Sequence, residues 1–317
     1  MRKTNQTLIT EFYLLGFGNL HSYKYLFFSI FLITYFIMLT GNILVIILVV
    51  CNKTLHFPMY FFLTQLSLCE IVFTTNIVPN MLRIILGNGG TMSVTACLGQ
   101  LYLSCVPSIT QCLILATMSF DRHIAICNPL RYMSIMTFRK QLHIVISCWA
   151  SGLMVSILTF AFVNELQFCK SNIINHIYCD ITPIIELSCS DTFSVELILS
   201  LASVFAILVP LLFIILTYIS IIVTILKIPS RSGRQKTFST CSSHLSVVCM
   251  YYGTMVSLYI YPPGKHYLNV NKILSLLYVV VTPLFNPVIY SLRNQDFRRA
   301  IFQTLQSSKQ KLCFKEN

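Results

Sequence analysis

Residues 25–50 read YLFFSIFLITYFIMLTGNILVIILVV, and this stretch contains no Asp, Glu, Lys or Arg. A helix needs about 20 mostly apolar residues to cross the hydrocarbon core of a membrane. The stretch is long enough for that, and it is too long for the apolar part of a cleavable signal peptide. Because it follows a polar tail, we expect it to be a first spanning helix that acts as its own signal anchor.

The composition of the whole chain agrees with a membrane protein. Of its 317 residues, 56% are hydrophobic and only 10% are charged, and the mean hydropathy is +0.74. A soluble globular protein carries about 25% charged residues, which help to cover its surface with polar groups. The composition therefore excludes a soluble enzyme, a nucleic-acid-binding protein and a disordered protein.

Six further stretches have the length and apolarity of spanning helices. The last of them is interrupted by Pro283 and Pro287, but neighbouring helices can satisfy the backbone groups that a proline frees. The sequence therefore predicts an all-α membrane protein, a seven-transmembrane helix bundle over residues 25–292 between an N-terminal tail (1–24) and a C-terminal tail (293–317). The expected spans are residues 25–50, 57–86, 96–120, 144–163, 197–226, 237–261 and 273–292.

The basic residues predict the orientation of this bundle. With seven spans the two ends of the chain lie on opposite sides, and 15 of the 22 Lys and Arg fall on the side of the C-terminus. The side richer in Lys and Arg faces the cytoplasm, so we expect an extracellular N-terminus with a glycosylation site at Asn5, in Asn-Gln-Thr. The net charge of +12 then faces anionic membrane lipid and protein partners. No nucleic acid is needed to explain it.

Four of the 13 cysteines lie on the expected extracellular side, where disulfides form. They are Cys97 at the start of the third span and Cys169, Cys179 and Cys189 in the long loop at residues 164–196. Four cysteines allow three pairings. We favour Cys97–Cys179, which would hold the middle of the loop against the third span, together with Cys169–Cys189. One or two free thiols are the alternative.

Two groups of side chains have the residue types of metal sites. The stretch HIYCD at residues 176–180 is one, but a cysteine in a disulfide no longer offers a thiolate, so we expect no metal there. Inside the membrane, Asn42, Glu70 and Asn286 would form one buried hydrogen-bonded cluster if their spans pack together, and a bound ion could assist this cluster. Ionisable groups inside spans are usually functional, although backbone or water could also satisfy each group locally.

Six motifs occur in order along the chain: LHFPMYFFL (55–63), MSFDRHIAIC (118–127), PLRY (129–132), KTFSTCSSHL (236–245), YYG (251–253) and PLFNPVIYSLRN (283–294). Together they resemble the signature of vertebrate olfactory receptors, of the rhodopsin-like class of G-protein-coupled receptors and of the larger branch associated with airborne odorants. The chain departs from that pattern at Glu70, His123 and Thr217, where the family usually has Asp, Tyr and Ser. Glu70 keeps the carboxylate but adds a methylene, which puts the binding of sodium in doubt.

Small and polar side chains recur at helical spacing in three of the spans. In the third span, Ser104, Ser108 and Cys112 recur every four residues on one face. The resemblance places such faces around a cavity in the outer half of the bundle, although the stripes alone would also fit ordinary helix packing. The expected ligand residues are Ser104, Cys105, Ser108, Ile109, Ala202, Ser203, Ala206, Ile207, Tyr252, Met255 and Tyr259.

The residues of these stripes restrict the ligand. None is charged, and Ser104 stands where related amine receptors have an Asp, so a cationic amine would lack its counter-ion. We therefore expect a small neutral, largely apolar, volatile odorant, held by shape and by one or two hydrogen bonds from hydroxyl groups. A carbonyl, an alcohol or an ether oxygen would each suit such donors.

The resemblance also implies how the signal leaves the bundle. The Arg122 guanidinium stays charged and needs a partner, for which we expect Asp121 in the resting form and Tyr218, Tyr290 or a partner helix once the bundle opens. The alternative is an arginine that merely extends to the cytosolic surface. The expected activation residues are Asp121, Arg122, Tyr218, His244, Asn286, Pro287 and Tyr290, and the implied partner is a heterotrimeric G protein of the stimulatory olfactory type, which raises cAMP.

These expectations describe a multi-pass receptor of the plasma membrane that is not an enzyme and needs no cofactor. One alternative is the same receptor fold tuned to a metabolite that is not an odorant. Another is a transporter or channel for small solutes, but transporters commonly carry inverted repeats and paired broken helices. Neither feature is evident in this sequence.

Overall fold

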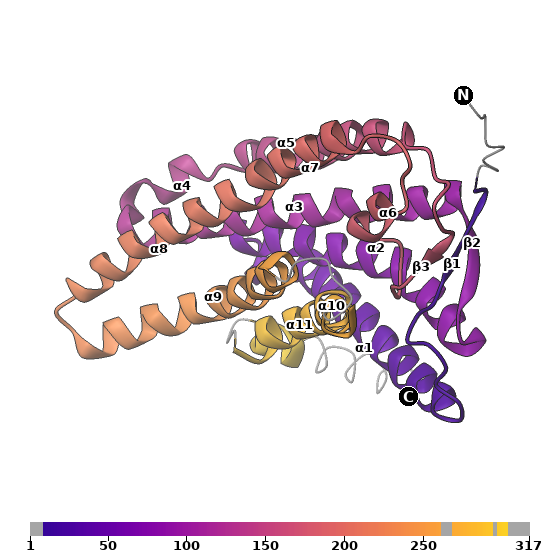
Figure 1. Cartoon of the computed structure of the whole chain (residues 1–317). Helices are drawn as coiled ribbons and strands as arrows, with labels where there is room; N and C mark the ends of the chain where they lie inside the picture. Colours follow the sequence, from indigo (N-terminus) through magenta and orange to yellow (C-terminus); the bar gives the residue numbers. More distant parts are fainter. Residues whose placement is uncertain (1–8, 261–267, 294–296, 304–317) are drawn as a thin grey trace, which may run out of the picture.

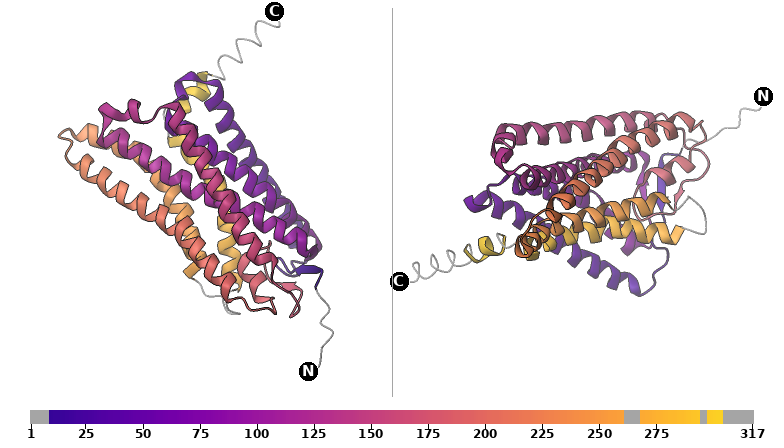
Figure 2. Two further views of the ribbon diagram at one scale, coloured as in Figure 1. Left: turned by 90° about the horizontal axis from the view of Figure 1, so that it is seen from above. Right: turned by 90° about the vertical axis from the view of Figure 1, so that its left-hand side faces the viewer.

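The computed structural model describes residues 9–260, 268–293 and 297–303, and its helices form one elongated bundle (Figures 1 and 2). Within these ranges the side chains of residues 236, 240, 259–260, 268–269 and 290–293 are not among those described. Of the expected site residues, Asn5 and the side chains of Tyr259 and Tyr290 therefore lie outside the described part of the chain.

The described residues form seven long helical segments, in the order that the sequence predicts. They are α1 (Tyr23–Cys51), α2 (Pro58–Gly87), α3 (Val94–Cys127), α5 (Phe138–Asn164), a continuous segment of α7 (Phe193–Ser203), η3 (Val204–Leu208) and α8 (Val209–Leu226), then α9 (Arg231–Ile260), and last α10 (Leu268–Leu276), η4 (Leu277–Val281) and α11 (Thr282–Arg293). Several helices continue beyond the expected spans, because helical hydrogen bonding does not stop where the apolar residues end. The limits of the spans stay a prediction.

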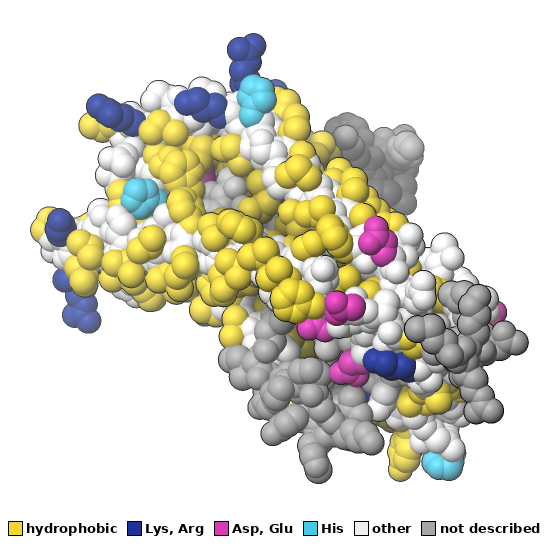
Figure 3. All heavy atoms as spheres, turned by 45° about the horizontal axis from the view of Figure 1, so that its top comes forward, with side chains coloured by type: hydrophobic (Ala, Val, Ile, Leu, Met, Phe, Trp, Pro, Cys, Tyr) yellow, Lys and Arg dark blue, Asp and Glu magenta, His cyan; other side chains and the backbone are white. Residues whose placement is uncertain are grey.

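Six of these segments are long and apolar enough to cross a membrane, as judged over the described residues. α9 is not among them, because its first half is rich in hydroxyl and basic side chains. It nevertheless packs against α3, α8 and α11 inside the bundle. Apolar side chains cover much of the face drawn in Figure 3, and Phe36 and Phe205 are 58% and 68% exposed. Only lipid makes so apolar an outer surface stable, so the fold is a seven-transmembrane helix bundle.

α3 lies at the centre of the bundle and packs against α2, α5, α8 and α9. Its inward residues Ile114, Leu115 and Met118 are fully buried. The fifth and seventh segments are each interrupted by one turn of π-helix, η3 and η4. A π turn inserts an extra residue and changes which side chains face inward, and such turns are frequent at functional sites.

A small sheet, which was not predicted from the sequence, closes the end of the bundle that carries the long loop. In it β1 (Glu11–Leu14) lies between β2 (Gly90–Ser93), to which it is antiparallel, and β3 (Ile173–Ile174), to which it is parallel. Phe12 and Leu14 of β1 are fully buried, so this part of the N-terminal tail belongs to the fold. The remaining short elements are η1 (Lys53–Leu55), η2 (Pro129–Arg131), α4 (Tyr132–Ile135) and α6 (Ile181–Glu186).

Candidate functional site

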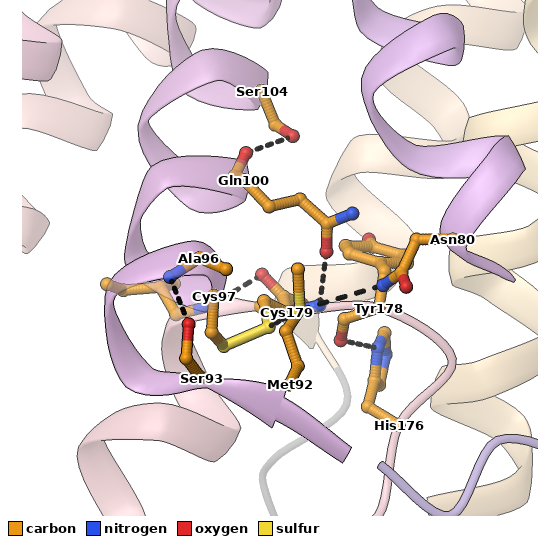
Figure 4. Close-up of a disulfide and its surroundings, with 12 residues drawn as sticks. Asn80, Met92, Ser93, Ala96, Cys97, Gln100, Ser104, His176, Tyr178 and Cys179 are labelled. Atoms are coloured by element: carbon orange, nitrogen blue, oxygen red, sulfur yellow. Dashed lines mark hydrogen bonds between the residues drawn. A yellow bond between two sulfur atoms is a disulfide. The ribbon is translucent and has the colours of Figure 1, made fainter. Parts of the chain in front are cut away.

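Two disulfides hold the long loop between α5 and α7. Cys97, in the first turn of α3, is bonded to Cys179, and Cys169 is bonded to Cys189, with Cα–Cα distances of 5.5 and 5.8 Å. These are the two pairs that we favoured from the sequence. Figure 4 shows that the backbone N–H of Cys179 also donates a hydrogen bond to Gln100 Oε1, at 3.1 Å. The middle of the loop is thus held over the end of α3.

The same loop is attached to α10 through a buried histidine. His176 is 4% exposed, and its Nδ1 lies 3.1 Å from the carbonyl oxygen of Tyr178 and its Nε2 lies 3.1 Å from Ser275 Oγ. Burial lowers the pKa of His176, and Lys272 acts in the same direction, while Asp180 opposes the shift. The neutral ring satisfies both contacts by donating from Nδ1 to the carbonyl and accepting from the hydroxyl at Nε2.

Ser104 is the first expected ligand residue along α3, and the proton of its hydroxyl is already used. It donates to the carbonyl oxygen of Gln100 and accepts from Asn76 Nδ2 of α2, each at 2.8 Å. Asn76 and Gln100 are joined further by a bond from Gln100 Nε2 to the carbonyl oxygen of Asn76, at 3.0 Å. Ser104 is therefore held in place by α2 as well as by its own helix.

Ser108 lies one turn further along α3, where three segments of the bundle meet. Tyr251 of α9 donates to the carbonyl oxygen of Ser108 at 2.8 Å, and Tyr278 of η4 donates to Ser108 Oγ at 2.9 Å. Both tyrosines are buried, whereas Ser108 itself is half-buried. A change in the position of α9 or η4 is thereby coupled directly to this serine.

The next turn of α3 continues the contact with α9. Cys112 is fully buried, its Sγ lies 3.4 Å from Tyr251 Oη, and its carbonyl oxygen accepts from Tyr252 Oη at 3.5 Å. Met255 is buried on the same helix as these tyrosines. The remaining expected residues of α3, Cys105 and Ile109, are half-buried.

The expected stripe on the fifth segment faces inward across the π turn. Its residues Ala202, Ser203, Ala206 and Ile207 are buried or half-buried, whereas Val204 and Phe205 between them are 41% and 68% exposed. Ile207 packs against the main core of the bundle. None of the described residues in the expected ligand set is charged.

Deeper in the bundle, the structure brings together the polar residues that we expected to cluster. Asn286 Nδ2 of α11 donates to Glu70 Oε1 of α2, and Asn42 Nδ2 of α1 donates to the carbonyl oxygen of Pro283 at 3.4 Å. Within the described part of the chain, one side-chain oxygen of each of Asn42, Glu70 and Asn286 is buried without a hydrogen-bond partner. Hard cations prefer carboxylate and amide oxygens, so these three fit a small cation. Sodium here stays a prediction.

At the other end of α3, the expected ion pair between Asp121 and Arg122 does not form in the part of the chain that the structure describes. Asp121 Oδ1 accepts from Tyr132 Oη of α4 at 2.9 Å, while Asp121 Oδ2 and Arg122 Nε have no hydrogen-bond partner there. Neighbouring residues of a helix point in directions about 100° apart, so they do not face each other. The prediction of that pair was therefore wrong for this form of the bundle.

Tyr218 of α8 and His244 of α9 join two helices beside this end of α3. Tyr218 Oη lies 2.7 Å from His244 Nδ1, and the two rings stack with centroids 5.8 Å apart. Tyr218 Oη also donates to the carbonyl oxygen of Cys241 at a longer 3.4 Å. His244 is fully buried. The pair forms a polar link that must break if α8 and α9 separate here.

Comparison with known proteins shows the family to which the chain belongs. Residues 31–308 match the family described as olfactory receptor. The chain belongs to the olfactory receptor family. It is 42% identical to human olfactory receptor 11L1 over 95% of this chain and 94% of that protein, and 42% identical to human olfactory receptor 6Y1 over 95% and 93%. It is 39% identical to olfactory receptor 226 of Rattus norvegicus over 96% and 94%.

The receptor is therefore a multi-pass plasma membrane protein of the G-protein-coupled class and not an enzyme. A hollow on its surface beside the last described helical turn is lined by Arg298, Arg299, Phe302 and Gln303, and none of the expected ligand residues contributes to it. The candidate ligand site is therefore inferred from the burial and hydrogen bonding of side chains and not from this hollow.

Three residues of the candidate site were not expected to belong to it from the sequence, namely Asn76, Tyr251 and Tyr278; Tyr251 was noted only as part of the motif YYG. Each places a polar group within an apolar span, where it needs a partner, and this was the signal that the sequence offered. The partners themselves were not readable, because they lie 28, 143 and 170 residues away along the chain.

Proposed function

We propose that the receptor binds a small neutral, largely apolar odorant in the outer half of the bundle and activates a stimulatory G protein of the olfactory type, which raises cAMP. The observation that carries the ligand site is the meeting of α9 and η4 on Ser108 of α3. A molecule bound there would contact three segments that can move relative to one another.

The uncharged character of the described ligand residues supports a neutral ligand. A cation placed among Ser104, Ser108 and Tyr252 would lose its hydration and gain no counter-ion, which is strongly unfavourable in a dry site. Small pockets of mainly apolar lining with a few polar groups are typical of sites for small organic molecules. Shape and a small number of hydrogen bonds would then distinguish one odorant from another.

The signal would pass along α9, because this helix carries the tyrosines near the ligand stripes as well as His244 near the cytoplasmic end of α3. Tyr251 and Tyr252 lie near the ligand stripes, and His244 lies about 10 Å further along the helix, at 1.5 Å per residue. A ligand shifts the equilibrium only if it binds one arrangement better than the other. We infer that the odorant favours the arrangement in which α9 has moved away from α8 and the link between Tyr218 and His244 is broken.

At the cytoplasmic end, such a movement would expose Arg122, whose Nε has no partner among the described contacts. The released hydroxyl of Tyr218 is one candidate partner for it, and a helix of the G protein is another. The basic stretch at residues 227–236 would face the same partner, together with anionic lipid. No nucleic acid is expected to bind.

The proposal is tested by expressing the receptor with an N-terminal epitope tag and measuring cAMP during exposure to a panel of neutral odorants. We expect a response to some of them, and we expect Arg122→Ala to abolish that response while the tag is still detected at the cell surface. A ligand-driven cAMP signal of normal size from Arg122→Ala would remove this arginine from the mechanism. A displayed receptor that answers only to permanently charged amines would overturn the proposed ligand class.

A further inference from the structure

We propose that Ser108 donates the hydrogen bond that holds the ligand, and that the receptor therefore prefers ligands whose oxygen can only accept one, such as ketones, esters and ethers, over the matching alcohols. This inference rests on the ligand site proposed above and specifies its chemistry. The hydroxyl groups around that site differ in whether their protons already have an acceptor.

Between Ser104 and Thr117, the other hydroxyl groups of α3 donate their protons to carbonyl oxygens of their own helix. Ser104 donates to the carbonyl oxygen of Gln100 at 2.8 Å. Thr110 and Thr117 donate in the same way to the carbonyl oxygens four residues earlier, at 2.8 and 2.9 Å. This is the usual arrangement for a serine or threonine within a helix. A hydroxyl bonded in this way has no proton left for a ligand.

Ser108 differs from these neighbours. Its Oγ accepts a hydrogen bond from Tyr278, at 2.9 Å, and among the described contacts it donates none to the carbonyl oxygen of Ser104. A hydroxyl has one proton and two lone pairs, so the bond from Tyr278 leaves the proton of Ser108 free. Ser108 is also half-buried, whereas Ser104 and Tyr278 are buried. The free donor is therefore on the more accessible residue.

Among the described contacts, both tyrosines beside Ser108 have an acceptor for their protons. Tyr251 donates to the carbonyl oxygen of Ser108 at 2.8 Å, and Tyr252 donates more weakly to the carbonyl oxygen of Cys112, at 3.5 Å, which is long for an O–H donor. A carbonyl or ether oxygen that accepts from Ser108 has no proton of its own to satisfy. An alcohol accepts equally well but also brings a proton, and the acceptors named above already take one bond each: Ser108 Oγ from Tyr278, and the carbonyl oxygens of Ser108 and Cys112 from the two tyrosines. The proton of an alcohol would have to share one of these acceptors, and a buried donor that is poorly paired is costly.

The test uses matched sets of a ketone, its secondary alcohol and its hydrocarbon on linear, branched and cyclic skeletons, with cAMP read against surface display. For each skeleton that activates the receptor, we expect the ketone to have the lowest EC50. Ser108→Ala should raise the EC50 of the ketone about five- to tenfold, the usual effect of losing one hydrogen bond, and leave that of the hydrocarbon unchanged. Ser108→Thr keeps the donor and should keep the preference.

Two comparisons separate this inference from a general loss of fit. Ser104→Ala should change ketone and alcohol in the same proportion, because the hydroxyl of Ser104 is already engaged, and Thr110→Val outside the site should change neither. Alcohols that match or exceed their ketones on the unmodified receptor would overturn the inference, as would an equal loss of ketone and hydrocarbon potency in Ser108→Ala. A displayed receptor that answers to none of the compounds would overturn the proposed function and this inference with it.

Discussion

Replacing His244 by Phe should raise the cAMP signal of the receptor in the absence of any ligand. His244 is fully buried, its Nδ1 lies 2.7 Å from Tyr218 Oη, and its ring stacks on that of Tyr218. Phe keeps an aromatic ring of similar size at this position and removes the nitrogen. The change therefore deletes the polar link between α8 and α9 and leaves the packing between them largely in place.

The size of the effect follows from the single bond that is lost. A hydrogen bond in a protein contributes about 1 kcal/mol net, and a buried group left poorly paired costs more. The hydroxyl of Tyr218 would retain only its bond of 3.4 Å to the carbonyl oxygen of Cys241, which is long for an O–H donor. A loss of about 1 to 1.4 kcal/mol from the closed arrangement raises the ratio of open to closed receptor about five- to tenfold.

The assay is basal cAMP in cells, divided by the surface signal of an N-terminal tag. Tyr218→Phe removes the same bond from the other side, together with the contact that its hydroxyl would make with Arg122 in the open form, and the double variant completes a double-mutant cycle. If the two side chains act through one bond, the double variant should weaken the closed form no more than His244→Phe does by itself. Basal cAMP equal to that of the unmodified receptor, at equal display, would refute the reasoning.

Two further expectations concern the outer loop and the packing of α1. The pKa of His176 is lowered by burial and by Lys272, against the opposing effect of Asp180. The neutral ring therefore stabilises the attachment of the long loop to α10 above a pH of about 6.5, the ordinary pKa of histidine. This stabilisation is lost as the pH falls below that value, because the ring must then be protonated. Ligand potency should then fall by at most about tenfold per pH unit, and His176→Gln should abolish this dependence; an unchanged pH profile in that variant would assign the effect to other groups. A Cβ at Gly41 would lie 3.1 Å from Cγ of Pro287, so Gly41→Val should push α1 away from α11. This should lower the free energy of unfolding by about 1 to 3 kcal/mol. If the purified variant unfolds at the same temperature as the unmodified receptor, this prediction is wrong.

The long helices of the fold were predictable, because the local composition of the sequence determines them. An uncharged run such as residues 25–50 must form a helix in lipid whatever its neighbours are, because no water is available to its backbone groups. The same holds for the other long helices, and α9 was predicted as well, although its polar first half makes it the least apolar of the seven. Position also predicted that four cysteines face one compartment, but it left three pairings open, and the structure forms the one that we favoured.

Reasoning from neighbours in the sequence failed where side-chain direction mattered. Asp121 and Arg122 are adjacent, and their opposite charges suggested a pair, but successive residues of a helix do not face each other. The acid is bonded instead to Tyr132 of α4, 11 residues along the chain. In the same way, β1 was treated as part of a polar tail, because the strands with which it pairs come from two distant connections.

By itself the sequence determined that this chain is a membrane protein, how many of its helices cross the membrane, and which residues have polar groups inside the bundle. Only the tertiary structure decided which of those groups are already satisfied. Ser104 and Ser108 are indistinguishable by type and spacing, yet Asn76 engages one and Tyr251 and Tyr278 engage the other. A hydroxyl has a single proton, and whether it remains free depends on partners that come close only when distant helices pack together.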